Sequence, residues 1–186
     1  MDKSTLRNEL KRKRKENFAF SSSLSNIIIS KVISHPKYIQ SKKVGIYVSK
    51  EDEVNTLPLL TSALKEKQVF VPKVVGDSMI MVRIHSIDEL HLGSFNILEP
   101  EDNIDASSLD LMIVPMLGYD DQKHRIGYGK GYYDRYFITH PNMYKLGLSY
   151  ASQHVDTTYP NKNDIPLDEI LTELSWGCFF QMFVLI

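Results

Sequence analysis

The segment spanning residues 125–135 combines the residue types that bind phosphate, in the order Arg-Ile-Gly-Tyr-Gly-Lys-Gly-Tyr-Tyr-Asp-Arg. Glycines at alternate positions let backbone N–H groups approach an anion without obstruction by a Cβ atom. Arg125 and Lys130 add positive charge for phosphate oxygens, and Asp134 can hold a magnesium ion that neutralises the same phosphates. The segment therefore indicates a binding site for a triphosphate.

This glycine segment, residues 125–135, matches neither of two common nucleotide-binding motifs. A Walker A loop needs Ser or Thr after its Gly-Lys pair, whereas Lys130 is followed by Gly131. The dinucleotide-binding fingerprint needs a third glycine where Tyr132 stands. Aromatic pairs spaced by four residues favour partial burial of the following helix, but core packing alone does not explain alternating glycines between two cations. We therefore favour anion binding.

Positive charge also gathers at the N-terminus, although the whole chain has a formal net charge of −1. Residues 1–16 hold seven basic side chains against three acidic ones. Lys3 and Arg7 are four residues apart and share one face of a predicted helix, where they can bind phosphate or form a solvated basic face. We expect the remaining basic run, residues 11–15, to face solvent.

The elements that must position these residues alternate between helical and strand patterns. Short apolar runs rich in β-branched residues predict strands, and apolar residues at helical spacing predict the helices between them. Such alternation indicates an α/β protein with a mostly parallel sheet, which binds ligands at the carboxyl ends of its strands. The predicted strands are 44–48, 69–71 (ended by Pro72), 79–84, 111–114, 146–150, 170–171 and 179–186, and the predicted helices are 3–16, 24–33, 55–67, 87–90 and 131–137.

Length and composition fit one soluble domain. The chain has 186 residues, and 42% of them are hydrophobic. Its one cysteine, Cys178, excludes an intramolecular disulfide framework and a cysteine-built zinc site, and we expect Cys178 and Trp176 to pack. Without a signal-peptide pattern or an apolar run near 18 residues, we expect a cytoplasmic protein with no membrane partner.

The glycine segment resembles the signature of the 5-formyltetrahydrofolate cyclo-ligases, also called methenyltetrahydrofolate synthetases. Other segments are similar to family positions in the same order along the chain: 3–7, 47–56, 98–100, 110–115, Gln153 and 163–168. Together with the pattern of elements, the resemblance implies a single domain over residues 1–186. We expect a three-layer α/β/α fold with a mostly parallel central sheet and N-terminal helices.

The resemblance also implies a reaction, the closure of 5-formyltetrahydrofolate to 5,10-methenyltetrahydrofolate with consumption of ATP and a requirement for Mg²⁺. Transfer of the γ-phosphate to the formyl oxygen would make that oxygen a leaving group. N10 of the same folate would then attack the formyl carbon. Catalysis of this type depends on positioning and charge stabilisation, and the expected partners are therefore ATP and a small folate.

Each site role that the resemblance implies falls on residues of this chain. It implies catalytic roles for Arg125, Lys130 and Tyr132. It implies ATP binding by Lys3, Ser4, Thr5, Leu6, Arg7, Arg125, Ile126, Gly127, Tyr128, Gly129, Lys130, Gly131, Tyr132 and Tyr133. It implies folate binding by Val48, Glu53, Tyr128 and Tyr132, and magnesium binding by Asp134 and Asp164, with Asp168 as the rival of Asp164.

Two other functions compete with this interpretation. A kinase or another ATP-dependent ligase would keep the phosphate site and use a different acceptor. A basic N-terminal arm could instead bind nucleic acid, but it would leave the glycine segment unexplained and has no stacking or zinc motif beside it. We therefore expect no nucleic-acid partner, and a monomer.

Overall fold

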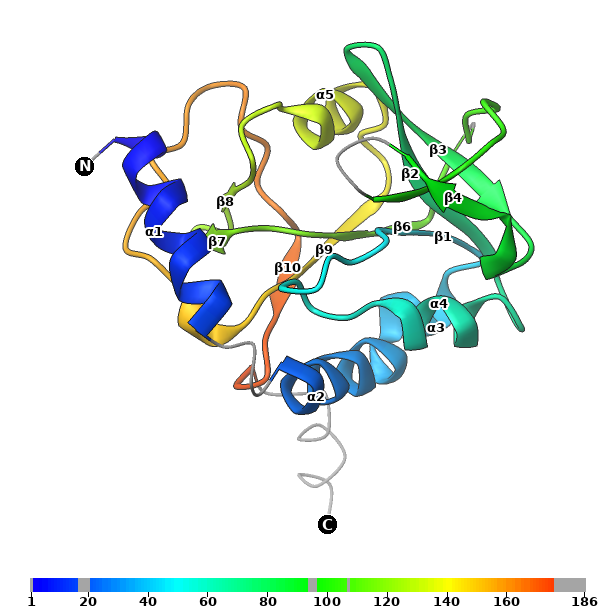
Figure 1. The fold of residues 1–186 in the computed structure, drawn as a ribbon, viewed down its shortest axis with the longest axis horizontal. Coiled ribbons are helices and arrows are strands. Elements are labelled where there is room, and N and C mark those ends of the chain that lie inside the picture. The colour runs from blue at the N-terminus through cyan, green and yellow to red at the C-terminus, as the bar shows by residue number, and fades with distance from the viewer. Residues whose placement is uncertain (1, 17–20, 94–96, 107, 176–186) are drawn as a thin grey trace.

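A computed structural model describes residues 2–16, 21–93, 97–106 and 108–175 (Figure 1). Its centre is a six-stranded sheet in the order β10-β9-β6-β1-β2-β3. All neighbouring strands pair in parallel except β2 and β3, which form an antiparallel hairpin. The mostly parallel sheet is thus confirmed. Its strands are β1 (Lys43–Ile46), β2 (Gln68–Val75), β3 (Ser78–Ile84), β6 (Leu111–Val114), β9 (Tyr144–Leu148) and β10 (Glu169–Leu171).

Helices cover both faces of this sheet, which confirms the three layers. In Figure 1, α2 (Ser21–Ser34), α3 (Pro36–Gln40) and α4 (Leu57–Ala63) lie below the sheet, and α5 (Tyr132–Thr139) lies above it. The first helix, α1 (Lys3–Glu16), stands apart from both layers, beside a short hairpin of β7 (Gly118–Tyr119) and β8 (Arg125–Ile126). Two elements lie at the opposite side, β4 (Leu90–Leu92) and β5 (Leu98–Pro100).

Two apolar cores flank the sheet because successive side chains of a strand point to opposite faces. In β6, Leu111 and Ile113 join the core under α2 and α4, while Met112 and Val114 join the core under α5. All of these side chains are fully buried. A central strand covered on both faces must be apolar at every position, which explains the continuous apolar run in the sequence.

A third, smaller apolar cluster attaches α1 to the rest of the domain. Leu6 and Leu10 of α1 pack against Leu117 and Ile126, which lie around the β7–β8 hairpin. A Cβ atom at Gly118 would lie 2.6 Å from a Leu10 methyl group and 2.8 Å from the backbone oxygen of Gln153. Glycine at this position therefore permits the close approach of the helix.

One strand extends further than the sequence predicts, because Pro72 does not end β2. Pro72 pairs with Met81 of β3, whose backbone N–H and C=O bond away from β2, to Asp105 and Ala106. The proline nitrogen therefore faces the other side, where pairing with β1 has already ended at Phe70. The missing N–H removes no sheet hydrogen bond there.

The remaining boundaries differ by a few residues from the predicted ones. The strand predicted at 44–48 ends at Ile46, and the one predicted at 146–150 is shifted towards the N-terminus. Helix α3 and the short hairpins β4–β5 and β7–β8 have no counterpart in the sequence prediction. Residues 179–186, predicted as a strand, lie outside the described residues, as do Trp176 and Cys178. Among the described residues, no helix is long and apolar enough to cross a membrane.

Replacing Leu10 by alanine tests the attachment of α1. The Leu10 side chain is fully buried, so we expect the free energy of unfolding to fall by about 2–5 kcal/mol. Urea titration followed by circular dichroism measures this change. Leu92→Ala in β4 is the matched control, because Leu92 is 72% exposed and its loss is expected to stay within about 0.5 kcal/mol. Equal stability of the two variants would contradict the packing described for α1.

Candidate functional site

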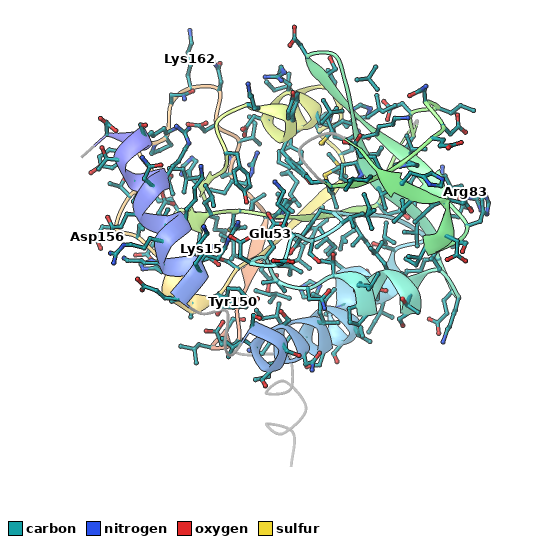
Figure 2. All side chains as sticks on the ribbon, viewed as in Figure 1. Lys15, Glu53, Arg83, Tyr150, Asp156 and Lys162 are labelled. Carbon is teal, nitrogen blue, oxygen red and sulfur yellow. The ribbon has the colours of Figure 1, made fainter. Side chains whose placement is uncertain are left out.

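The segments that follow β1, β6 and β9 meet at one edge of the sheet, because these neighbouring strands run in parallel. The Tyr150 hydroxyl, just after β9, donates to the backbone oxygen of Glu53, which follows β1, at 3.1 Å. Figure 2 shows Glu53 near the centre of the molecule, to the right of α1. The sequence predicts ligand binding at these carboxyl ends of the strands.

The glycine segment crosses this edge as a short strand, a turn and the start of α5. Gly129 and Gly131 have positive φ angles of 97° and 67°, which other residues rarely adopt. Gly131 precedes the first residue of α5 and provides no side-chain cap for its amides. The N-terminus of α5 thus opens on the turn, where its dipole and amides favour an anion.

Two cations of α1 reach the glycine segment and the loop before β10. The Arg7 guanidinium donates through Nε to the backbone oxygen of Gly127 at 3.0 Å and lies against Gly129. The Lys3 ammonium pairs with Asp164 at 2.5 Å. Ser4 and Thr5 are exposed on the same first turns of α1. The structure thus brings Lys3 and Arg7 next to the glycine segment and its neighbouring loop, as expected of residues that bind one ligand.

Arg125 and Lys130, the cations of the glycine segment assigned to phosphate, have different surroundings. The Arg125 side chain is 6% exposed and bonds Asp134 at 2.9 Å and the backbone oxygen of Ile165 at 3.1 Å. Burial lowers the pKa of Arg125, and Asp134 opposes that shift. Lys130, in contrast, is exposed on the turn. Arg125 therefore links the glycine segment to the loop before β10, whereas the exposed Lys130 can contact a ligand.

The two aspartates expected to bind magnesium belong to adjoining segments. Asp134 accepts the backbone N–H of Ile165 at 3.0 Å, so it lies beside the residue that follows Asp164. Burial opposes ionisation of Asp164, but the bonds from Lys3 and Asn161 hold its pKa below the usual value. Asp168 instead pairs with Lys145, near the start of β9 and away from the carboxyl ends of the strands. This placement favours Asp164 over Asp168.

The donor set of this pair fits magnesium. Magnesium is commonly bound by one or two carboxylates together with phosphate oxygens and water. Asp134 and Asp164 each use one carboxylate oxygen in the described bonds, which leaves the second oxygen of each carboxylate for an ion. The part of the chain that the structure describes holds no cluster of three or more His, Cys, Asp or Glu side chains suited to a metal. A metal at this place would therefore depend on phosphate ligands.

Two of the four residues expected to bind folate, Val48 and Glu53, lie just past β1, and the other two, Tyr128 and Tyr132, belong to the glycine segment. Val48 and Glu53 are buried, and Glu53 accepts the backbone N–H of Lys50 at 2.9 Å. The Tyr128 hydroxyl donates to the other oxygen of Glu53 at 3.3 Å, so the glycine segment contacts this loop directly. Burial raises the pKa of Glu53, and Arg14 and Lys50 oppose that shift.

The expectation that residues 11–15 face solvent is wrong for Arg14. Its side chain is 2% exposed and donates to Asp52 through Nε at 3.0 Å and Nη2 at 2.8 Å. It also hydrogen-bonds the Tyr128 hydroxyl and pairs with Glu53 at 3.6 Å. A signal was present in the sequence, because Lys3, Arg7, Leu10 and Arg14 follow one another at helical spacing on a single face.

The aromatic side chains of the glycine segment divide between exposed and packed positions. The Tyr128 ring is 44% exposed and lies under the Lys50 ammonium, 4.9 Å from the ring centre, and its burial and the neighbouring Glu53 raise its pKa to about 12. Tyr133 packs beneath Arg125, and Tyr132 lies under the guanidinium of Arg135. Arg135 also bonds the backbone oxygens of Lys130 and Asp77, so it ties the tip of the β2–β3 hairpin to the glycine turn.

A separate cavity of about 610 Å³ lies between β3 and the segment 100–106, with Ser108 also in its lining. Its lining includes Arg83, which Figure 2 shows on the side of the molecule opposite α1. The cavity shares no residue with the cluster around Glu53 and the glycine segment. The candidate site is therefore a surface of convergent loops and not the large cavity.

Comparison with known proteins shows which family the chain resembles. A family model described as the 5-formyltetrahydrofolate cyclo-ligase family matches residues 1–173. A relative from Mus musculus, 5-formyltetrahydrofolate cyclo-ligase, is 33% identical over 166 residues, which cover 80% of this chain and 82% of the relative. The protein of the same name from Escherichia coli K12 is 26% identical over 153 residues, covering 77% of this chain and 84% of that protein.

Two solved structures have the same fold. The NMR structure of 5,10-methenyltetrahydrofolate synthetase from Aquifex aeolicus superposes with a TM-score of 0.84 at 35% identity, covering 94% of this chain and 91% of the other. The 5,10-methenyltetrahydrofolate synthetase from Mycoplasma pneumoniae superposes with a TM-score of 0.73 at 26% identity, covering 93% of this chain and 99% of the other.

Alanine at Gly129 and at Gly127 forms a matched pair that tests the geometry of the turn. Gly129 has φ of 97°, and its new Cβ would lie 3.2 Å from the Arg7 guanidinium carbon, whereas Gly127 has open space around it. We expect Gly129→Ala to lower the free energy of unfolding by about 1–3 kcal/mol and Gly127→Ala by less than about 0.5 kcal/mol. Chemical denaturation of both variants measures the difference. An equal decrease in the free energy of unfolding of both variants would show that the positive φ of Gly129 and its contact with Arg7 do not affect stability.

Proposed function

The chain belongs to the 5-formyltetrahydrofolate cyclo-ligase family, and on that premise we propose how its site performs the reaction. It is an enzyme that closes 5-formyltetrahydrofolate to 5,10-methenyltetrahydrofolate. We propose that closure consumes ATP, requires Mg²⁺, and releases ADP and inorganic phosphate.

The chemistry explains why a phosphate site must lie beside a folate site. The N5-formyl group is an amide, and its oxygen is a poor leaving group. In the proposed mechanism, this oxygen attacks the γ-phosphorus of ATP, the bond to ADP breaks, and the formyl carbon becomes electrophilic. N10 then attacks that carbon, its proton is lost, and the carbon–oxygen bond breaks to release phosphate. Both substrates must therefore be held in one fixed relation.

The observation that supports this proposal is the convergence of three segments on one edge of the sheet. Lys3 and Arg7 of α1 reach the glycine segment and its neighbouring loop. The glycine segment in turn contacts the buried Glu53 through Tyr128. A cationic surface with open backbone amides thus adjoins a buried carboxylate, as a triphosphate and a pterin require.

On the phosphate side, we assign the charge to two sources. Lys130 is exposed on the turn and stabilises the transferring phosphoryl group, while Arg125 holds the turn from beneath through Asp134. Tyr132, at the first position of α5, completes the catalytic set. The remaining residues proposed to bind ATP are Lys3, Ser4, Thr5, Leu6, Arg7, Ile126, Gly127, Tyr128, Gly129, Gly131 and Tyr133.

Asp134 and Asp164 would hold the magnesium ion together with phosphate oxygens. The ion would supply positive charge that neutralises the phosphates and favours the loss of ADP. Lys3 already pairs with Asp164, so this lysine lies within reach of both the carboxylate and a phosphate group.

On the folate side, Glu53 and Val48 bind different parts of the pterin. Glu53 is a hydrogen-bond acceptor in a buried setting, and a pterin presents a row of N–H donors along one edge. Val48 supplies an apolar surface at the carboxyl end of β1. Tyr128 and Tyr132, from the glycine segment, close the side that faces the nucleotide.

Formation of the methenyl product tests the proposal directly. We expect its absorbance to appear only when 5-formyltetrahydrofolate, ATP and Mg²⁺ are all present. Lys130→Ala removes a charge from the developing transition state, so we expect kcat to fall by roughly 10²- to 10³-fold while the circular dichroism spectrum is unchanged.

Lys65→Ala is the control for that variant, because Lys65 is exposed near the end of α4 and lies outside the site. Its kcat should match that of the unmodified enzyme. Consumption of ATP without the methenyl product would instead indicate a different phosphoryl acceptor. A Lys130→Ala enzyme with normal kcat would remove Lys130 from the mechanism.

A further inference from the structure

Resting on the proposed function, we propose that Arg14 is a positioning residue of the reaction. It holds Glu53 and Tyr128 in the arrangement that binds the folate. Through it, the helix that carries the ATP-binding Lys3 and Arg7 also organises the folate side of the site. Arg14 itself contacts neither substrate in this proposal.

The first support is the set of segments that the Arg14 guanidinium joins. It bonds Asp52 through two nitrogens, at 3.0 and 2.8 Å, in the loop after β1. It reaches the backbone oxygen of Met116, after β6, at 3.5 Å. It also bonds the hydroxyl of Tyr128 in the glycine segment. One planar side chain thus links three of the loops that build the site.

The second support is the dependence of Glu53 on these contacts. One oxygen of its carboxylate is held by the Lys50 N–H at 2.9 Å, in its own loop. The other oxygen is held by the Tyr128 hydroxyl at 3.3 Å and by Arg14 at 3.6 Å. Because Tyr128 is itself bonded to Arg14, loss of the guanidinium removes one restraint directly and weakens the other.

Charge gives a third support. Glu53 faces Arg14 from α1, Lys50 and Asp52 from its own loop, and three tyrosine hydroxyl groups, those of Tyr47, Tyr128 and Tyr133. Tyr150 contacts its backbone oxygen. Burial raises the pKa of Glu53, and Arg14 is a cation that lowers it. Without Arg14, the carboxyl would protonate at higher pH and cease to be a full acceptor for the pterin.

A structural role alone explains these contacts less well. The apolar cluster of Leu6, Leu10, Leu117 and Ile126 already docks α1. A buried ion pair is a weak source of stability, because removing two charges from water costs about as much as their attraction returns. The more specific effect of the Arg14 contacts is therefore the geometry that they impose on Glu53.

Steady-state kinetics of Arg14→Met and Arg14→Lys test the proposal. Methionine keeps much of the apolar stem and removes the charge, so we expect the KM for 5-formyltetrahydrofolate to rise roughly 10- to 100-fold. The KM for ATP should rise far less, by at most about threefold, because Arg14 bonds Tyr128 of the ATP-binding set, whereas Lys3 and Arg7 are retained and α1 remains docked. In Arg14→Lys the charge returns without the planar fork, and the folate KM should remain raised.

The pH profile of kcat/KM for the folate separates positioning from general destabilisation. In Arg14→Met its acidic limb should move to higher pH, since Glu53 loses a cation that lowered its pKa. In Asp52→Asn the limb should move to lower pH, because Asp52 raises the pKa of Glu53, while the folate KM still rises as Arg14 loses its anchor. The acidic limb thus shifts in opposite directions in the two variants, while the folate KM rises in both. This combination distinguishes positioning of Glu53 from general destabilisation of the protein.

Arg12→Met is the matched control on the same helix, because its guanidinium is 71% exposed and pairs only with Glu16 among the described residues. It should leave both KM values unchanged. If Arg14→Met does not fold, Asp52→Asn carries the test, since Asp52 lies partly at the surface. A folate KM within twofold of the parent in the folded variants overturns the proposal, as does an equal rise in both KM values. Failure of the unmodified enzyme to form product would instead refute the proposed function.

Discussion

The parallel pairing of β9, β6 and β1 determines where chemistry can occur in this protein. Neighbouring parallel strands deliver the chain to the same edge of the sheet each time, so the loops after Ile46, Val114 and Leu148 converge although they are far apart in sequence. The apolar cores on both faces make that sheet rigid. The loops at its edge can therefore carry polar groups whose positions are set by the strands beneath them.

The basic character of the first sixteen residues has a different meaning once the helix is docked. Lys3, Arg7 and Arg14 turn inward, towards Asp164, Gly127 and Asp52 respectively. Two more cations pair along the helix surface, with Glu9 and Glu16. A segment with a formal excess of positive charge therefore becomes one wall of a polar site, and its cations are distributed along that wall at helical intervals.

The sequence allows the architecture to be predicted better than the polar contacts. The apolar runs of β1 and β6 and the alternation of helices and strands are local patterns, and they indicated the layered, mostly parallel fold. The prediction that Pro72 ends the strand is wrong because the effect of a proline depends on which side of β2 is paired. Arg14 was misjudged because an exposed and a buried arginine look alike in a basic run, and only the tertiary partners Asp52 and Tyr128 decide between them. The placement of Lys3 and Arg7 on one helix face was visible from spacing, but the loops they meet were not.

The long-range attachment of α1 bears on the order in which the chain can assemble during translation. Helix α1 packs on Leu117 and Ile126 and bonds Gly127 and Asp164, so these partners are synthesised more than a hundred residues after it. Until then its apolar stripe has little to cover it, and a lone helix of this length is marginal in water. Closing such a large loop is a slow, late event in folding. The proposed nucleotide and folate surfaces therefore form together, after Asp164 has emerged, when α1 returns to a nearly complete sheet.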